Sequence, residues 1–385
     1  MPVIRSSDLE LFYDLSGPET APVVAFSNSL GATLEMWEAQ AVALSQRYRC
    51  LRYDARGHGR SETFDRPTTI DDLADDLAGL LDALDIGKAH VVGLSIGGMT
   101  AQALAARHPE RVTTLALLAS SAGFGAEAAW RDRAALVRRD GVEAVVDLTI
   151  DRWFSPGFRE AAPDTIARAR ERFLATDGPG YARCCEVIAT TDLRDRIGAI
   201  SVPTLIVVGA DDAATPPAMS EDMRQRIAGS ELVTLSGARH QLAIERADAV
   251  NAHLMAFFAR HGGAADFDRG LAVRTSVLGA DYVDAALRSA GDFGAPWQDF
   301  ITRYAWGEIW GDPTLPRKTR SLITLAMMVA LHREEEFKMH VRPALGNGVS
   351  VEEMRAMVKQ AAVYAGVPAG NAAIRWMREV FGEEL

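Results

Sequence analysis

Apolar and polar residues alternate in a regular way through the first 260 positions of the chain. Short apolar runs, typical of buried strands, are separated by longer stretches with helical spacing. The predicted strands are Leu9–Tyr13, Pro22–Phe26, Tyr48–Tyr53, His90–Leu94, Val202–Gly209 and Leu232–Leu235, and the predicted helices are Trp37–Gln46, Asp71–Leu84, Met99–His108 and a segment that begins near Leu242. Such alternation predicts a mostly parallel sheet with helices on both faces. The acids of Asp71–Leu84 lie on its polar face and are interpreted as solvated surface.

The pattern changes after Arg260. The Gly/Ala-rich stretch His261–Asp266 is typical of a linker, and helical spacings follow it at Ala295–Trp310, Pro316–Leu331, Glu334–Leu345, Val351–Ala365 and Pro368–Phe381. The sequence therefore predicts two domains, an α/β domain over 1–262 and an all-α domain over 266–385. The nearly continuous apolar run Leu322–Leu331 predicts a helix buried on more than one side, which favours packing between the subunits of a homo-oligomer.

Composition narrows the possible partners and the compartment. The net charge is −11 and the chain has no run of lysines or arginines, which argues against a nucleic-acid or anionic-membrane partner, because both require a positive face. The first residues lack the apolar core of a signal peptide, and no run of about 18 apolar residues occurs. The three cysteines, Cys50, Cys184 and Cys185, have no framework spacing. These features predict a soluble cytoplasmic protein.

The segment around Ser95 carries the first candidate chemistry. Gly93, Ser95 and Gly97 form a G-x-S-x-G motif between a predicted strand and a predicted helix. A serine on such a tight turn presents its hydroxyl above the sheet, and the small neighbours leave room for adjacent backbones. The five-residue motif alone is weak evidence, because glycine and serine are common. Its position between a strand and a helix predicts a nucleophile.

Two further loops extend this pattern. Ser27–Gly31 follows one predicted strand, and Asp54–Ser61 has the form D-x-R-G-x-G-x-S after the next. Together the three motifs resemble the α/β-hydrolase superfamily, in which a catalytic acid and then a histidine follow the serine along the chain. The matching acid is Asp212, with Asp211 as the weaker alternative, and the matching histidine is His240.

This resemblance implies a catalytic triad of Ser95, His240 and Asp212. A serine hydroxyl is a poor nucleophile until an imidazole accepts its proton, and the imidazole needs a carboxylate to fix its tautomer. The backbone N–H groups of Leu30 and Ile96 match the donors of the oxyanion hole. The other histidines of this domain have simpler interpretations, His58 and His108 as loop or helix-end residues and His90, His253 and His261 as surface residues.

The segment from Gly125 to about Asp195 interrupts the strand and helix alternation with helical, arginine-rich sequence. In an α/β-hydrolase such an insertion is a cap that selects the substrate. Trp130, Arg133 and Trp153 are the candidate substrate-binding residues of this cap, with Trp130 as an apolar wall and Arg133 as the contact for an anion. The alternative is that the arginines simply face water.

The all-α region has motifs of its own. Phe300–Trp310, Lys318–Leu322, Glu336–Val341, Ala344–Val349 and Tyr364–Pro368 together resemble the carboxymuconolactone decarboxylase family over essentially all of residues 270–382. Relatives that act as thiol peroxidases carry a C-x-x-C ahead of the histidine, whereas this chain has no cysteine after Cys185. The resemblance therefore implies decarboxylation without thiol chemistry, and we expect no metal and no organic cofactor.

His340 is the candidate acid of this region, with Glu308 and Glu336 as its candidate partners. Glu336 precedes His340 by four residues, so both lie on one helical face, where the carboxylate can orient the imidazole or raise its pKa toward neutrality. The alternatives are an exposed i,i+4 pair without function and a structural cap role for Glu308. Arg320 is a weaker candidate for holding a substrate carboxylate.

The second resemblance narrows the substrate of the first domain. Carboxymuconolactone loses its ring-attached carboxylate to give an enol-lactone, and Ser27–Gly31 together with the segment around Trp130 resembles the 3-oxoadipate enol-lactone hydrolases. The implied function is two consecutive steps of protocatechuate breakdown, with small carboxylated lactones as substrates. The competing hypotheses are a general esterase or perhydrolase whose helical domain only oligomerises, and a non-catalytic binding module.

Overall fold

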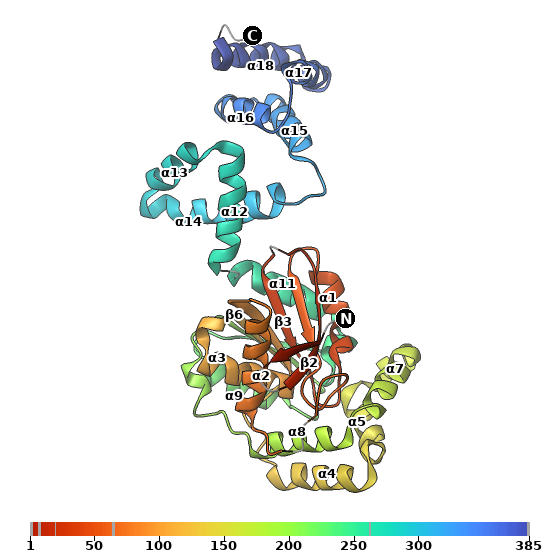
Figure 1. The fold of residues 1–385 in the computed structure, drawn as a ribbon. Helices are drawn as coiled ribbons and strands as arrows, with labels where there is room; N and C mark the ends of the chain where they lie inside the picture. Colours follow the sequence, from red (N-terminus) through yellow and green to blue (C-terminus); the bar gives the residue numbers. More distant parts are fainter. Residues whose placement is uncertain (1–2, 7–8, 20, 64–65, 262, 383–385) are drawn as a thin grey trace. The chain divides into compact units, whose positions relative to one another are not determined.

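The chain divides into two units in the computed structural model, Met1–Gly262 and Gly263–Leu385 (Figure 1). The structure describes residues 3–6, 9–19, 21–63, 66–261 and 263–382. Within these ranges, none of the helices is both long enough and apolar enough to span a membrane.

An eight-stranded sheet forms the centre of the first unit, in the order β1-β2-β4-β3-β5-β6-β7-β8. The β1/β2 and β2/β4 pairs are antiparallel and the other neighbours are parallel. The strands are β1 (Val3–Ser6), β2 (Leu9–Ser16), β3 (Val23–Ser27), β4 (Arg49–Tyr53), β5 (Ala89–Leu94), β6 (Val112–Leu118), β7 (Thr204–Gly209) and β8 (Glu231–Leu235). Every residue of β5 and β7 is buried, as in a sheet covered on both faces. The predicted α/β fold class is confirmed.

Helices connect these strands and cover the sheet. They are η1 (Leu34–Trp37), α1 (Glu38–Leu44), α2 (Ile70–Ala83), α3 (Ile96–Arg107), η2 (Pro109–Arg111), η4 (Ile197–Ala199), α9 (Pro217–Arg226), α10 (Leu242–Glu245) and α11 (Ala247–His261). A capping box between Thr69 and Asp72 starts α2. Helix α2 packs against α3, and α1 packs against α11.

Two sequence predictions within this unit are wrong. Asp76 of α2 is buried rather than solvated, because it pairs with Arg56. His90 lies in the interior rather than on the surface, where its Nδ1 lies 2.9 Å from Thr114 Oγ1 and its ring packs on Phe258. Both side chains contact residues that are distant in sequence. Such contacts cannot be recognised from the residues next to Asp76 or His90.

Helices α4–α8 form the insertion between β6 and β7. They are α4 (Glu127–Asp140), η3 (Val142–Val145), α5 (Val146–Trp153), α6 (Pro156–Ala161), α7 (Pro163–Leu174) and α8 (Gly178–Thr190). Helices α4, α5, α7 and α8 gather at one end of the unit (Figure 1), and α4 packs along α8. We call this group of helices the cap.

The second unit is helical throughout its described residues. Its elements are α12 (Gly263–Leu278), α13 (Ala280–Ser289), α14 (Gly291–Ile301), the π-helix η5 (Thr302–Trp310), α15 (Arg317–Ala330), α16 (Glu334–Gly346), α17 (Val351–Ala365) and α18 (Val367–Phe381). Buried apolar residues of α15–α18, including Leu325, Phe337 and Trp376, form its core. The predicted all-α class is confirmed.

The sequence prediction missed parts of this unit. Helices α12 and α13 were not predicted, and the stretch predicted as a linker is helical from Gly263 onward, while Gly262 lies outside the described residues. The helix predicted over Ala295–Trp310 is divided into α14 and a π-helix. In the single chain the run Leu322–Leu331 is buried on one side, since Leu325 is inaccessible but Met327 is half exposed, and its predicted burial against another subunit stays a prediction.

Candidate active sites

Ser95 lies on a strained turn between β5 and α3. Its φ of 59° and ψ of −119° fall outside the regions that most L-residues adopt. A Cβ on Gly93 would lie 2.1 Å from the carbonyl oxygen of Gly97, and a Cβ on Gly97 would lie 2.2 Å from that of Ser27. Only glycine fits at these two positions. The backbone N–H of Ser95 donates to Leu118 O at 3.0 Å, which holds the turn above the sheet.

His240 and Asp212 meet at the ends of β7 and β8. Asp212 Oδ2 lies 2.9 Å from His240 Nδ1, and both side chains are buried. Asp212 also accepts from the Thr215 hydroxyl at 2.6 Å and from the backbone N–H groups of Ala214 and Thr215. Burial raises the pKa of Asp212, but the attraction of His240 and these hydrogen bonds outweigh it and hold the pKa below its usual value. Asp211 is exposed, so the structure brings Asp212 and not Asp211 to the histidine.

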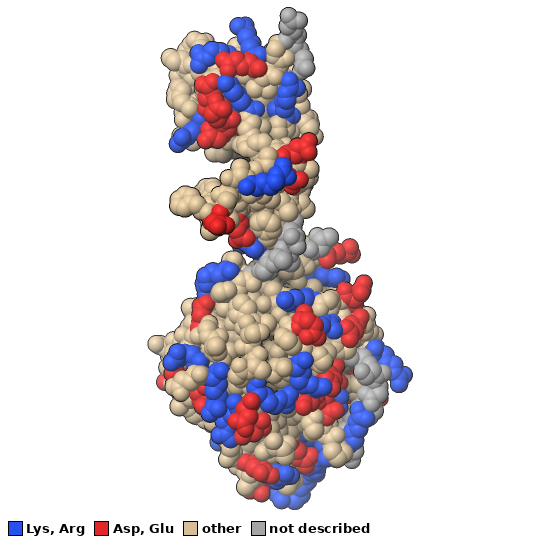
Figure 2. Space-filling view, turned by 90° about the vertical axis from the view of Figure 1, so that its left-hand side faces the viewer, with Lys and Arg blue, Asp and Glu red and all other residues tan. Residues whose placement is uncertain are grey.

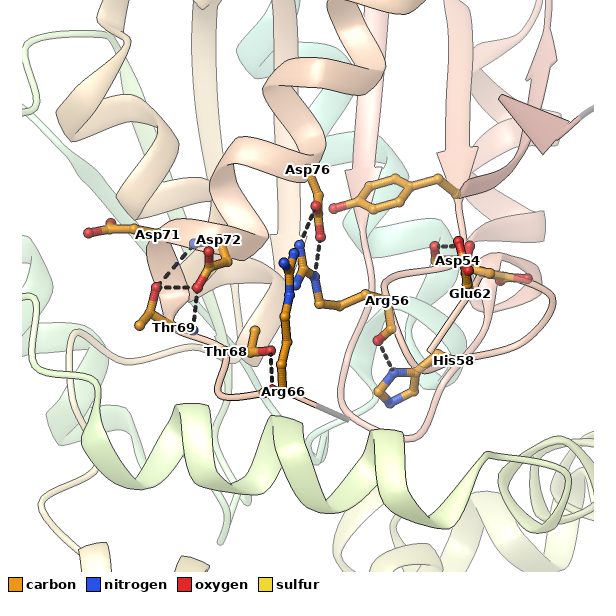
Figure 3. Close-up of polar contacts among 12 residues, drawn as sticks. Asp54, Arg56, His58, Glu62, Arg66, Thr68, Thr69, Asp71, Asp72 and Asp76 are labelled. Atoms are coloured by element: carbon orange, nitrogen blue, oxygen red, sulfur yellow. Dashed lines mark hydrogen bonds and ion pairs between the residues drawn. The ribbon is translucent and has the colours of Figure 1, made fainter. Parts of the chain in front are cut away.

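The loop that carries Leu30 is braced by the motif Asp54–Ser61. His58 Nε2 accepts from the backbone N–H of Gly31 at 2.9 Å, and Asp54 Oδ1 accepts from that of Leu34 at 2.7 Å. His58 Nδ1 faces the carbonyl oxygen of Arg56 at 3.2 Å (Figure 3), so the ring donates there and stays neutral. Burial lowers the pKa of His58, in agreement with that neutral state. The local motif shows only a loop histidine and does not reveal this role.

Arg56 fixes the same motif to α2. Its Nε and Nη2 donate to the two carboxylate oxygens of Asp76, each at 2.6 Å, and both side chains are buried (Figure 3). Such a bidentate pair is geometrically specific. Gly57 of this loop packs on Gly180 of α8, with room for no Cβ on either residue. The motif therefore links the Leu30 loop, α2 and the cap.

A cavity of about 620 Å³ lies between the cap and the ends of the strands. We call it the catalytic cavity. Its lining joins the predicted residues Leu30, Ser95, Trp130, Arg133, Trp153 and His240. Ile96 does not line it through its side chain, but Ile96 is the first residue of α3, where the N–H groups lack acceptors within the helix. Tyr181 and Arg152 also line the cavity and were not predicted.

Arg133 is the positive group of this cavity that is held most firmly. Its guanidinium donates to the Tyr181 hydroxyl at 2.8 and 2.9 Å and to Thr149 Oγ1 at 2.6 Å. It lies 6.0 Å from the ring centre of Trp130. These partners are neutral, and no carboxylate of the described residues lies within 4.0 Å of Arg133. The charge is positioned without being neutralised, which suits an anionic substrate.

His340 is the centre of a second candidate site. It is buried in α16 and stacks with Trp306 and Trp310 of the π-helix, at ring distances of 6.3 and 6.1 Å. Burial lowers its pKa to about 4. The expectation that Glu336 raises this pKa toward neutrality is wrong for the single chain, because Glu336 is exposed on α16. π-Helices are frequent at functional sites, and no sequence pattern had indicated this one.

The other predicted residues of this unit have partners of their own. Glu308 lies 3.5 Å from Arg269 Nη2 of α12. Arg320 donates to the carbonyl oxygen of Asp312 at 2.7 Å, and the carboxylate of Asp312 lies 3.8 Å from its guanidinium. These contacts run to Arg269 and Asp312, and the predicted cooperation of Glu308, Glu336 and Arg320 with His340 stays a prediction.

Among the described residues, no three His, Cys, Asp or Glu side chains are grouped so that they could hold a metal ion. On the face shown in Figure 2, basic and acidic side chains are intermixed over both units.

Comparisons with known proteins match each unit separately. The family model described as alpha/beta hydrolase fold matches residues 22–145, and one described as TAP-like protein matches residues 181–265. The first unit is similar to 3-oxoadipate enol-lactonase 2 of Acinetobacter baylyi, with 37% identity over 64% of this chain and 92% of that protein. It is also similar in structure to the enol-lactonase from Burkholderia xenovorans LB400, with a TM-score of 0.66 and 42% identity over 67% of this chain and 99% of that one.

The model described as Carboxymuconolactone decarboxylase family matches residues 295–379. The same region is similar to 4-carboxymuconolactone decarboxylase of Acinetobacter baylyi, with 47% identity over 30% of this chain and 86% of that protein. The chain belongs to both families. Its first part is a hydrolase unit of the α/β-hydrolase family and its second part a decarboxylase-family unit, which confirms both predicted resemblances.

Proposed function

We propose that the decarboxylase-family unit converts 4-carboxymuconolactone to 3-oxoadipate enol-lactone and that the hydrolase unit opens this enol-lactone to 3-oxoadipate. One observation supports the proposal above all. A single catalytic cavity joins Ser95, the His240–Asp212 pair and the unneutralised Arg133, so a nucleophile and an anion contact face the same space. A carboxylated lactone needs both.

Hydrolysis starts with the attack of Ser95 Oγ on the lactone carbonyl while His240 accepts the hydroxyl proton. Asp212 holds His240 Nδ1–H and stabilises the imidazolium, and the N–H groups of Leu30 and Ile96 receive the oxyanion. The ring C–O bond then breaks as the His240 imidazolium gives its proton to the departing enol oxygen, and the enol tautomerises to a ketone, which makes ring opening effectively irreversible. Water activated by His240 releases the acyl chain from Ser95 as a carboxylate.

Decarboxylation uses the substrate as its own electron sink. The departing carboxylate is attached to a carbon that is conjugated through the ring double bond with the lactone carbonyl, so the electron pair left by CO₂ spreads into a dienolate. One proton must then reach the far carbon of this dienolate. We assign its delivery to His340. The bound substrate is an anion, and an opposite charge nearby raises the pKa of a histidine, so the substrate supplies the charge partner that His340 lacks in the single chain.

We also propose that the decarboxylase-family unit assembles into a homo-oligomer. Ile323, Met327 and Tyr364 line an apolar groove between α15 and α17, and all three are exposed. Contiguous exposed apolar surface of this kind marks interaction sites in soluble proteins. Val3, Val42 and Leu148 are the exposed large apolar side chains among the described residues of the hydrolase unit, and they lie far apart in the chain.

The test supplies 4-carboxymuconolactone to the full-length chain and follows CO₂, enol-lactone and 3-oxoadipate. Wild type should form 3-oxoadipate. Ser95→Ala should still release CO₂ but accumulate enol-lactone, with lactone hydrolysis reduced about 10⁴-fold or more. His340→Ala should fail to release CO₂ and yet hydrolyse enol-lactone that is added directly. Near-normal 3-oxoadipate formation by Ser95→Ala would contradict the serine mechanism.

The competing hypothesis is a general esterase with a helical oligomerisation module. It predicts hydrolysis of neutral esters at rates similar to those for enol-lactone, and no CO₂ release by either variant or by wild type. The same set of assays therefore separates the two hypotheses.

A further inference from the structure

The aromatic ring of Tyr181, on helix α8 of the cap, contacts the loop that carries Leu30. Gly31 directly follows Leu30. A Cβ on Gly31 would lie 3.1 Å from Tyr181 Cε2 and 2.5 Å from Phe173 Cε2, so the two rings leave no room for a side chain there. Phe173 of α7 packs edge-to-face on Tyr181, with 5.5 Å between the ring centres. These two rings of the cap therefore set the position of the backbone beside a proposed oxyanion donor.

The hydroxyl group of the same tyrosine holds Arg133. Two guanidinium nitrogens of Arg133, Nε and Nη2, donate to Tyr181 Oη at 2.9 and 2.8 Å. Thr149 Oγ1 accepts a further hydrogen bond from Nη2 at 2.6 Å, and its own hydroxyl donates to the carbonyl oxygen of Val145 at 2.7 Å. Among the described residues, two of the three hydrogen bonds of Arg133 therefore end on the phenol oxygen of Tyr181.

The charge state of Tyr181 decides what its contact does to Arg133. Only 1% of the surface of Tyr181 is exposed, and burial raises the pKa of its hydroxyl, so the side chain remains a neutral phenol. A phenolate would neutralise the guanidinium, whereas a phenol accepts its hydrogen bonds and leaves the positive charge available to a ligand. An arginine that is already held in place also loses less conformational entropy when an anion binds to it.

We propose that Tyr181 is a positioning residue for both ends of the substrate of the hydrolase unit. Its hydroxyl orients Arg133 toward the carboxylate of an anionic acyl chain, and its ring fixes the loop whose Leu30 N–H receives the carbonyl oxygen. The hydroxyl therefore determines the preference for acyl chains that end in a carboxylate, and the ring supports the rate with every ester. The roles of Arg133 and Leu30 belong to the proposed function, and the inference rests on it to that extent.

The test compares two esters with the full-length chain, mono-4-nitrophenyl glutarate and 4-nitrophenyl valerate. Their acyl chains have the same number of carbons, and only the glutarate chain ends in a carboxylate. In Tyr181→Phe the KM for the glutarate ester should rise about fivefold to tenfold, because the freed arginine side chain must be ordered on binding. The KM for the valerate ester and both kcat values should equal those of wild type. Tyr13→Phe is the matched control, since Tyr13 lies on β2 and does not line the catalytic cavity.

A double-mutant cycle separates positioning from a general loss of structure. Arg133→Ala should raise the KM for the glutarate ester about tenfold or more, and Tyr181→Phe in that background should raise it no further. Misfolding would instead lower Vmax for both esters and leave each KM unchanged. Additive effects of the two substitutions, or equal changes for the two esters in Tyr181→Phe, would overturn the role of the hydroxyl.

Tyr181→Leu tests the role of the ring. Without the ring contact at Gly31 the oxyanion loop is less firmly held, so kcat should fall at least about tenfold for the neutral valerate ester as well. Titration with an organophosphate that phosphorylates Ser95 counts the reactive sites and corrects for any loss of structure. A wild-type kcat per reactive site in Tyr181→Leu would overturn the role of the ring. No lactone is used, so a chain that hydrolyses both esters but not enol-lactone would contradict the proposed function and not this inference.

Discussion

His240 and His340 are both buried, but their electrostatic surroundings differ. His240 lies 2.9 Å from the buried carboxylate of Asp212, which is itself held by Thr215. His340 packs against two neighbouring indole rings, and burial lowers its pKa to about 4. A histidine with a fixed acid can accept a proton during the reaction, whereas one without an acid must obtain its charge partner from a ligand or from another subunit.

This difference extends to the two units as a whole. In the hydrolase unit, loops after β3, β5, β7 and β8 bring every member of the proposed triad and its oxyanion donors to one end of the sheet. In the decarboxylase-family unit, the candidate acids Glu308 and Glu336 point to Arg269 or to solvent. The hydrolase unit thus brings the predicted hydrolytic groups together, whereas we propose that the second site depends on a bound substrate or on another subunit.

The largest expected effect removes the charge beside His240. Asp212→Asn keeps the size of the side chain but favours the wrong imidazole tautomer, so kcat for lactone hydrolysis should fall about 10⁴-fold. Asp211→Asn is the matched control, because Asp211 is its exposed neighbour, and its rate should equal that of wild type. Stopped assays with enol-lactone measure both. If the two variants lose similar activity, the function of His240 does not depend on the carboxylate of Asp212. The proposed difference between His240, with a carboxylate partner, and His340, without one, would then be wrong.

The next effect concerns the charge state of His340. Its pKa in the folded chain is about 4, below the ordinary value of 6.5, so the unfolded chain takes up the proton first as the pH falls. The contribution of neutral His340 to the free energy of unfolding is fully present above pH 6.5. It is lost as the pH falls toward 4, and the total loss is about 3 kcal/mol. Subtracting the denaturant stability of His340→Gln from that of wild type at each pH cancels the contributions of His58 and His90. A flat difference curve would show that His340 has a charge partner in the folded protein.

The hydrolase unit was largely predictable from the sequence, because its chemistry lies in short local motifs. G-x-S-x-G needs glycine where Gly97 approaches Ser27, and a single strand-to-helix turn specifies Ser95. What the sequence did not reveal are contacts between distant segments. Asp76 was placed on the surface because α2 has many acids, and only the fold places Arg56 against it.

The decarboxylase-family unit was less predictable for two physical reasons. A π-helix has no periodic signature of its own, so the stacking of Trp306 and Trp310 on His340 could not be derived. The spacing of Glu336 and His340 was correct for a shared helical face, but α16 is amphipathic, and burial at one position does not extend to a residue one turn away. The spacing of residues along a helix shows which of them share a face. How deeply each one is buried depends on tertiary packing.

A smaller effect is expected from charge on the apolar groove of α15 and α17. Met327→Asp places a carboxylate on a surface that we propose to be buried between copies, and desolvation of that charge should weaken assembly at least about tenfold. Sedimentation measures the shift toward monomer, and CO₂ release should fall with it while lactone hydrolysis persists. Val42→Asp is the control, because Val42 is an exposed apolar residue of the hydrolase unit. Equal mass distributions for both variants would exclude the groove from the interface.

The smallest effect tests whether Glu336 serves His340 at all. In the single chain Glu336 is exposed, and an exposed i,i+4 pair contributes only about 0.2–0.5 kcal/mol. Glu336→Gln should therefore change the rate of decarboxylation by no more than about twofold to threefold, whereas His340→Gln in the same assay should abolish it. Because Gln keeps the length and hydrogen bonding of Glu, any larger loss must come from the charge. A hundredfold loss in Glu336→Gln would mean that assembly or substrate binding brings this carboxylate to the imidazole. His340 would then have a carboxylate partner, as His240 does.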